Sequence, residues 1–356
     1  MPSAATAAVK SPLVVHEETV SGRCEAYVAN HPLATAYHHP SWLKLIASAF
    51  GQETRYLTAE SAQGIVGVLP LVLFSGRLSS RIFGRFAVSM PFVNYGGVLA
   101  DTPEAERALL ERAIDVTRAS GGTHLELRHT YQKFSDLAPR RHKVAMRLGL
   151  ETTSDEQWQR LDRKVRNQVR KAEKSGLDVQ HGGQGLLPLF YGVFARHMRD
   201  LGTPVYGSRF FDDVLSTFPD TTRVFVVTLA SRALAAAVVH WHRDTVEVPW
   251  ASALRESNPL CANVFLYWHM LTFAVERGFR QFDFGRSTPG EGTFNFKKQW
   301  GAEPQPLVWE YWMAGGGSVP DLSPKNPKYA LAIKAWQHLP VGVATALGPH
   351  IVRNIP

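Results

Sequence analysis

The chain of 356 residues contains only two cysteines, Cys24 and Cys261, and they lie far apart. Two such residues provide neither a disulfide framework nor the spacing of a zinc site. The fourteen histidines also lack metalloenzyme spacing, because His240 and His242 have no third ligand identifiable by position. A nucleophile elbow, a Walker loop and a dinucleotide fingerprint are missing as well. We therefore expect no metal and no tightly bound cofactor.

Long apolar runs are also lacking. The longest one, near Ile65 to Phe74, has about half the length that a bilayer span needs. The N-terminal residues show no charged head followed by an apolar run, so no secretory signal is predicted. We expect a cytoplasmic protein. The segment Tyr329 to Ile351 is apolar with few charges. It either covers the protein's own core or makes a peripheral membrane contact.

Positive charge is plentiful, with 39 Lys and Arg against 31 Asp and Glu and a net charge of +8. Much of it lies in Leu161 to Ser175, where Leu161, Val165, Val169 and Ala172 form one apolar stripe. This pattern predicts a helix with a cationic face, ended by Gly176. We expect Arg166 and Arg170 to bind a phosphate-rich ligand. The alternative is an ordinary solvated surface helix.

The two halves of the chain predict the same order of elements. The second half predicts a strand, two helices, three strands, a long helix and a further strand: Leu177 to Gln180, Leu186 to Leu201, Ser208 to Phe218, Thr222 to Leu229, Leu234 to His242, Thr245 to Ala253, Pro259 to Arg277 and Phe279 to Phe284. The first half repeats the helix, hairpin, strand, helix and strand: Ser41 to Phe50, Thr54 to Ala59, Ile65 to Phe74, Pro91 to Leu99, Pro103 to Ala119 and Thr123 to Arg128. This order is typical of GNAT acyltransferase folds.

Two features distinguish the first half. A Gly/Ser loop carries Arg77, Arg81 and Arg85, which either grip a phosphate or are simply solvated. The run Phe92 to Gly97 places Tyr95 beside two glycines, where the backbone can approach a ligand closely. The alternative for Tyr95 is a side chain that faces the core from a β-bulge.

Near the end of the second half, an apolar strand leads into Gly285-Arg286-Ser287, and Lys297 and Lys298 follow between aromatics. A lysine beside apolar walls stabilises negative charge better than one in water, because the local dielectric is low. We expect Lys297 to face a cleft beside Arg286, with Phe296 and Trp300 excluding water. On an extended segment Lys298 would point away. The alternative is a pair of lysines that solvate a turn.

With these features the chain resembles the FemAB-like peptidyltransferase family over roughly residues 30 to 315. More narrowly, it is similar to FemAB-related proteins associated with exosortase/PEP-CTERM exopolysaccharide systems. The residues that carry the resemblance are Arg166 to Lys174, Leu201 to Tyr206, Asp283 to Ser287 and Phe296 to Gly301.

The resemblance implies an α/β (α+β) protein with two tandem GNAT-like domains, each a mixed sheet flanked by helices. The limits expected are 1–150 for the first domain, 151–176 for the basic linker helix, 177–315 for the second domain and 316–356 for a C-terminal tail. It implies transfer of an acyl or aminoacyl group, from acyl-CoA or aminoacyl-tRNA, to an amine of a cell-envelope or exopolysaccharide precursor, lipid- or nucleotide-linked. Lys297 would stabilise the transition state. The candidate substrate-binding residues are Arg286, Tyr206, Tyr95, Trp300, Phe296, Arg166 and Arg170.

A rival from another class is a non-enzymatic module that binds RNA or glycan through the basic helix. A catalyst should need Lys297 individually, whereas a binder should lose affinity gradually as cations are removed.

Overall fold

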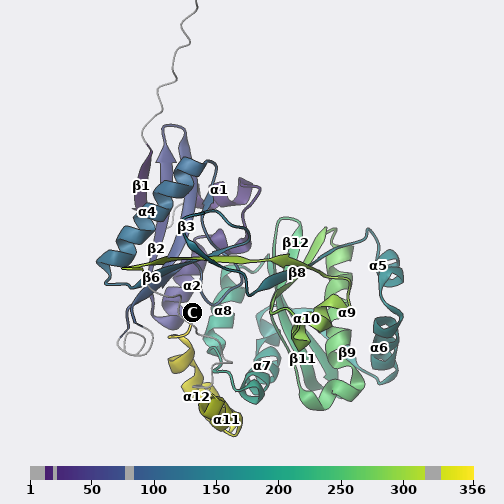
Figure 1. The fold of residues 1–356 in the computed structure, drawn as a ribbon. Coiled ribbons are helices and arrows are strands. Elements are labelled where there is room, and N and C mark those ends of the chain that lie inside the picture. The colour runs from purple at the N-terminus through teal and green to yellow at the C-terminus, as the bar shows by residue number, and fades with distance from the viewer. Residues whose placement is uncertain (1–12, 19–21, 77–83, 317–329) are drawn as a thin grey trace, which may run out of the picture.

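The computed structural model describes residues 13–18, 22–76, 84–316 and 330–356. Within them the chain forms two β-sheets, each flanked by helices (Figure 1). The predicted tandem α/β fold is confirmed. Arg77 and Arg81 of the predicted phosphate loop lie outside the described residues.

The first sheet has the strand order β1-β2-β3-β4-β6-β15-β7, and β5 pairs with β3. Its neighbours are antiparallel except β4 and β6, which run parallel. The strands are β1 (Val14–Glu18), β2 (Glu53–Ser61), β3 (Gly64–Phe74), β4 (Phe86–Val88), β5 (Leu99–Ala100), β6 (His124–His129), β7 (Ala138–Arg140) and β15 (Val308–Met313).

The second sheet has the order β14-β8-β13-β12-β11-β10-β9. Here β12 and β13 are the parallel pair. The strands are β8 (Val144–Gly149), β9 (Asp178–Gly182), β10 (Thr222–Leu229), β11 (Arg232–His242), β12 (Thr245–Ala253), β13 (Gln281–Ser287) and β14 (Glu303–Pro306). In both sheets, then, an antiparallel meander leads through a helix to a parallel strand, as the repeated element order predicts.

The two sheets exchange strands. β8 precedes the basic helix in the chain, yet it lies in the second sheet between β13 and β14. β15 follows the second unit, yet it returns to the first sheet and pairs with β6 and β7. The domain limits predicted at residues 150 and 315 therefore do not coincide with the limits of the two sheets. The chain crosses between the sheets more than once.

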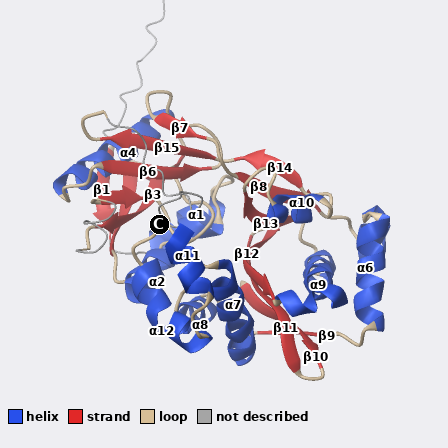
Figure 2. Cartoon of the chain, turned by 60° about the horizontal axis from the view of Figure 1, so that its bottom comes forward, coloured by secondary structure: helices blue, strands red, loops and turns tan. Residues whose placement is uncertain are grey.

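Helices cover both faces of each sheet (Figures 1 and 2). In the first sheet alternate residues face opposite cores: Tyr56 packs with α2, whereas its neighbour Leu57 packs with α4. In the second sheet α7 and α8 cover one face and α9 the other, and α6 packs on α9. The helices are α1 (Gly22–Asn30), α2 (Ser41–Phe50), α4 (Pro103–Ala119), α5 (Ser154–Arg160), α6 (Arg163–Lys174), α7 (Leu187–Leu201), α8 (Ser208–Thr217), α9 (Ala262–Glu276), α10 (Gly292–Lys298), α11 (Ala330–Gln337) and α12 (Val341–Val352).

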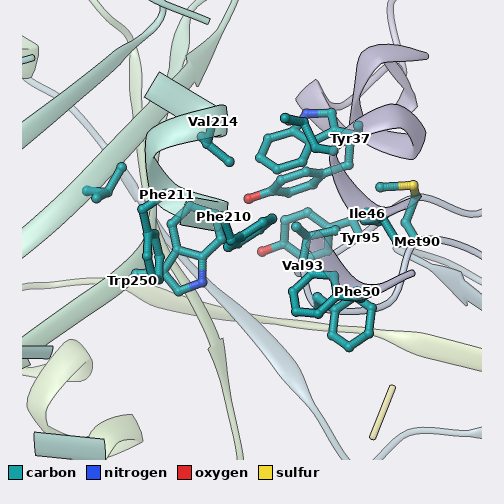
Figure 3. Close-up of a cluster of buried hydrophobic side chains, with 14 of the residues drawn as sticks. Tyr37, Ile46, Phe50, Met90, Val93, Tyr95, Phe210, Phe211, Val214 and Trp250 are labelled. Atoms are coloured by element: carbon teal, nitrogen blue, oxygen red, sulfur yellow. The ribbon is translucent and has the colours of Figure 1, made fainter. Parts of the chain in front are cut away.

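One hydrophobic core spans both units. Phe50 of α2 packs in a tilted arrangement against Phe210 of α8, with ring centroids 5.1 Å apart, and Phe210 packs edge-on against Trp250 of β12 (Figure 3). Tyr37 and Tyr95 of the first unit lie beside these rings. Because buried aromatic area contributes strongly to stability, the two units are held as one packed body.

Local signals account for the helices that the sequence predicts well. α4 begins at Pro103 after Thr102, whose hydroxyl accepts a hydrogen bond from the Ala105 amide, and Gly121 follows its end with φ +74°. α6 begins after Asp162, whose carboxylate accepts from the Lys164 amide. Its stripe of Val165, Val169 and Ala172 is buried, as predicted.

Two local predictions are wrong. Pro91 to Leu99 is not a strand: Met90 and Phe92 have positive φ, and the segment crosses to the second unit as an irregular loop with only Leu99 in β5. Lys297 and Lys298 are not on an extended segment but in the short helix α10. Lys297 is buried and Lys298 exposed all the same, because neighbouring positions of a short helix also point in different directions.

Among the described helices, none is long and apolar enough to cross a membrane.

Candidate functional site

A β-bulge in β13 shapes the centre of the site. The pairing of β13 with β8 shifts between Asp283 and Arg286, so one residue is extra in β13. Gly285 lies in this bulge with φ +73°. A Cβ there would lie 3.0 Å from the Asn94 side chain and 3.2 Å from the Val248 carbonyl oxygen. Glycine is needed both for the backbone angle and for this close approach.

The loop that follows β4 inserts its polar side chains into the second unit. The Asn94 side-chain amide donates to Glu247 and accepts from Arg286 Nε at 2.9 Å. The Tyr95 hydroxyl donates to Asp283 at 2.9 Å. Both side chains are buried. The irregular backbone of this loop therefore places the Asn94 amide and the Tyr95 hydroxyl against the parallel strands β12 and β13 of the other unit.

Glu247 and Asp283 form a buried pair of carboxyl groups. They are direct partners in the parallel pairing of β12 with β13. Burial, and after it the negative charge of Asp283, raise the pKa of Glu247 to about 8. The Tyr37 hydroxyl donates to Glu247 at 2.8 Å, and Arg147 Nε donates to Asp283 at 2.9 Å. Asp283 thus has a cation beside it, whereas Glu247 has only neutral donors and can hold or release a proton near neutral pH.

Lys297 lies against the carbonyl groups of the bulge. Its ammonium donates to the Gly285 carbonyl at 3.2 Å and to the Arg286 carbonyl at 2.8 Å. Burial lowers the pKa of Lys297 to about 8, the positive charge of Arg286 lowers it too, and Asp283 opposes the shift. A lysine ammonium has three donors, so one remains beyond these two contacts.

Two arginines from equivalent strands meet at one tryptophan of β15. Arg128 of β6 lies 4.4 Å from the ring centre of Trp309, and Arg286 of β13 lies 5.4 Å from it. Burial and the charge of Arg128 lower the pKa of Arg286 to about 10. The two guanidinium groups are therefore held by cation–π contacts with Trp309 in a poorly hydrated environment.

A cavity of about 400 Å³ opens onto the carboxyl pair from between the two units. Glu247, Asp283, Tyr95 and Arg147 line it. The walls come from both units: Pro32 to Ala36, Thr130 and Tyr131 from the first, and His240, His242 to Thr245 and Gln281 from the second. It is polar enough to accept an amine and its attached chain.

A second groove, of about 560 Å³, lies at the N-terminus of α9. It is lined from α6 by Lys164, Val165 and Gln168, and from α10 and its C-cap by Asn295, Phe296 and Gln299. A helix N-terminus favours negative charge, and Lys164 adds a cation. In the described part of the chain Lys297 lines neither this groove nor the interdomain cavity, so the prediction that it faces a cleft is not confirmed. Its helix borders the groove, and the carbonyl groups that it contacts follow Asp283, which lines the cavity.

The structure brings three of the predicted residues together: Lys297, Arg286 and Tyr95 all lie within one hydrogen-bonded network around the bulge. Tyr206 packs among Phe50, Phe92 and Phe210, where burial raises its pKa and the nearby charge of Arg286 opposes that shift. Trp300 and Phe296 pack against Tyr267 of α9.

Arg166 and Arg170 lie elsewhere. Arg170 covers the ring of Trp158 of α5, and Arg166 donates to Gln159 at 3.3 Å. The side of α6 that lines the groove carries Lys164 and Gln168 instead. Periodicity found the apolar stripe, but it could not tell which part of the polar face meets a neighbour.

Sequence reasoning missed most of the network: Glu247, Asp283, Asn94, Arg147 and Tyr37. An acidic residue inside an otherwise apolar strand, as in Thr245 to Ala253, was the one available signal, because a carboxylate is rarely buried without a reason. In the ranges that the structure describes, no cluster of three or more His, Cys, Asp or Glu could hold a metal ion.

Residues 159–298 match the family model of an acetyltransferase (GNAT) domain, and no curated protein matches the chain. Among solved structures, the chain is similar to FemX, with TM-score 0.63 and 15% identity, covering 90% of this chain and 100% of that one. It is similar to the C-terminal domain of a putative lysylphosphatidylglycerol synthetase from Agrobacterium fabrum, with TM-score 0.56 and 12% identity, covering 83% and 91%. A tandem GNAT protein from the clavulanic acid biosynthesis pathway gives TM-score 0.52 and 12% identity, covering 86% and 100%. At these identities the likeness is one of fold, and that fold is the tandem GNAT fold.

Proposed function

We propose that this protein transfers an acyl or aminoacyl group from an activated donor to an amine. The observation that carries the proposal is the Glu247–Asp283 pair on an interdomain cavity, one bulge away from Lys297. The match of residues 159–298 to a GNAT domain supports the same class of reaction.

The acceptor amine enters the cavity of about 400 Å³ and reaches Glu247. An amine attacks a carbonyl only through its lone pair, so a proton must leave its nitrogen. A carboxylate with a pKa of about 8 is basic enough to take that proton, because the ideal general base titrates near the working pH. Tyr37 and Asn94 hold the carboxyl group in place by donating to it.

The amine nitrogen then bonds to the donor carbonyl carbon, and the carbonyl oxygen gains the electron pair. Lys297 lies against the bulge rather than on the wall of either space, and from there its positive charge and remaining donor stabilise this oxyanion in a poorly hydrated site. When the oxyanion collapses, the bond to the thiolate or ribose oxygen breaks, and that atom leaves with its electrons and takes up the proton that Glu247 received from the amine. Positioning of the two reactants contributes the rest of the acceleration.

The groove at the N-terminus of α9 is the proposed donor site. Both acyl-CoA and aminoacyl-tRNA carry phosphates, which Lys164 and the helix N-terminus favour. As narrower proposals, the acceptor is an amine of a cell-envelope or exopolysaccharide precursor, and Arg286, Tyr206 and Tyr95 contribute to substrate binding.

The test is to incubate the purified protein with a panel of amines and either acetyl-CoA or charged tRNA, and to follow the products by mass spectrometry. The proposal expects an amide with one donor class, and its loss in Glu247→Gln. If neither donor yields an amide while tRNA or glycan binds with salt-dependent affinity, the chain is a binding module instead.

A further inference from the structure

The C-terminal helices α11 and α12 both expose large apolar side chains. Val343, Leu347, Ile351 and Ile355 follow one another at intervals of four along α12 and its end, with exposed fractions of 41%, 47%, 38% and 37%. This spacing places them on one stripe of the helix. On α11, Leu331 is 83% exposed. Soluble monomers rarely leave such a row of large apolar side chains uncovered.

The stripe is not a core face that has failed to pack, since the opposite side of the same helices is closely packed. Ala344, Gly348 and Val352 are buried. A Cβ on Gly348 would lie 2.8 Å from the Val205 backbone, and one on Gly202 would lie 2.5 Å from the Ile333 side chain. Arg199 of α7 further donates to the Leu339 carbonyl in the turn between the helices. The hairpin is therefore fixed on α7, and its outer face is presented in a set orientation.

The charge on this face has one sign. From Ala330 to Pro356 the chain contains no Asp or Glu, while Lys334, His338 and His350 are exposed among the apolar side chains. A hairpin with exposed apolar side chains, an exposed lysine and no carboxylate side chain of its own is complementary to the interface of a bilayer that contains anionic lipids, where apolar burial and electrostatic attraction add. A protein partner would more often leave charges of both signs at the rim.

We propose that the α11–α12 hairpin docks the protein on an anionic lipid surface, with Leu331, Val343, Leu347 and Ile351 entering the interface and Lys334 contacting headgroups. The proposal does not depend on the acyl-transfer reaction.

The experiment is co-sedimentation of the full chain with two kinds of vesicle, phosphatidylcholine with phosphatidylglycerol and phosphatidylcholine alone. We expect the wild type to bind the anionic vesicles, and the combined variant Val343→Ser, Leu347→Ser, Ile351→Ser to bind about tenfold less tightly or worse. The matched control is Leu189→Ser, which removes a 36% exposed leucine from α7 and should bind like the wild type. Lys334→Glu should weaken binding to the anionic vesicles only.

Three outcomes would overturn the proposal: a wild type that stays in the supernatant with both vesicles, a triple variant that binds as well as the wild type, or a wild-type dimer in light scattering that the triple variant dissociates. The last would assign the face to a second copy of the chain. Thermal melts of all variants confirm that they fold, and the single variant Leu347→Ser replaces the triple variant if that one does not.

Discussion

The parallel strand pairs of the two units carry similar polar side chains, with two differences. In the first sheet β4 and β6 end their pairing at Val88 and Glu126, and in the second β12 and β13 end theirs at Glu247 and Asp283. The carboxylate on the second strand of each pair accepts hydrogen bonds from one tyrosine and one arginine. On β6, Tyr311 and Arg128 donate to Glu126. On β13, Tyr95 and Arg147 donate to Asp283. Only the second unit has a second carboxyl group opposite.

The bulge explains why the arginines behave differently. In the first unit Arg128 follows Glu126 by two residues on the same strand and pairs with it at 2.7 Å. In the second unit Gly285 adds one residue, so Arg286 turns away from Asp283 and binds Asn94. The extra glycine thus goes with the loss of the ion pair between neighbouring residues of one strand. In its place, two backbone carbonyl groups of the bulge accept hydrogen bonds from Lys297. The comparison teaches that the ion pair of the first unit is satisfied by its own side chains, whereas the bulge of the second unit leaves its arginine bound to a side chain of the other unit.

The largest loss of turnover is expected from a substitution of Glu247, the carboxyl group that the first unit lacks. Glu247→Gln keeps the hydrogen bonds from Tyr37 and Asn94 but cannot take a proton, so turnover should fall by about 10²–10⁴-fold. In the wild type, activity should rise with pH as Glu247 ionises near its pKa of about 8. Steady-state rates across pH check both expectations, and a variant with wild-type turnover would refute this assignment.

The same variant has a stability consequence of known sign. The folded-state pKa of Glu247 is raised above its unfolded value, so its contribution to stability is fully present below the unfolded pKa and is lost as pH rises through about 8. Glu247→Gln should therefore melt at a higher temperature than the wild type at pH above 8, and the gap should close in mild acid.

Lys297→Met should lower turnover by about 10²–10³-fold, because it removes one oxyanion donor. The wild-type rate should also decline at high pH as Lys297 loses its proton near its pKa of about 8. Lys298→Met is the matched control, since Lys298 is exposed on the same helix and should leave turnover nearly unchanged. If Lys297→Met lowers the melting temperature but not kcat, then Lys297 only holds the bulge.

Gly285→Ala tests the bulge itself. The positive φ and the contacts with Asn94 and Val248 should cost about 1–2 kcal/mol of the free energy of unfolding. Denaturant titration measures this, and turnover should fall with it because Arg286 and Asn94 are displaced. Gly290→Ala, in the open turn before α10 with φ +80° and no neighbour within 4 Å, is the control for backbone strain alone. An equal loss of unfolding free energy in the two variants would mean that the close approach of Asn94 to Gly285 contributes nothing to stability.

The basic helix α6 has one polar side that lines the groove and another that covers Trp158, and substitutions on the two sides should affect donor binding differently. Lys164→Glu should raise the KM for a phosphate-bearing donor by about tenfold at low salt, because Lys164 lines the groove. Arg170→Glu should change it less, since Arg170 lies over Trp158. The reverse ranking, measured over a salt series, would restore the face that carries Arg166 and Arg170 as the ligand-binding one.

The smallest effect on turnover is expected from the first unit. Glu126→Gln should change kcat by less than about threefold while costing about 1–3 kcal/mol of stability, because the partly unsatisfied Arg128 stays buried. A large loss of kcat with little loss of stability would show that the first unit takes part in the reaction.

The sequence by itself determined the elements that depend on neighbours along the chain. Apolar periodicity and caps placed α4 at Pro103–Ala119, β10 at Thr222–Leu229 and β12 at Thr245–Ala253 with the bounds observed. These features are local, because side-chain spacing and terminal hydrogen bonds involve residues at most a few positions apart. The nearness of Lys297 to Arg286 followed in the same way, from a short turn between them.

Tertiary structure alone decided the rest. The pKa of Glu247 depends on Tyr37, which is 210 positions away in the chain, on Asn94, and on a strand partner reached through α9. The exchange of β8 and β15 between sheets likewise leaves no local pattern, since the pairing of each strand is set by residues far away in the chain. Burial and charge act through space, so the chemistry of a carboxyl group is fixed only once distant segments have packed around it.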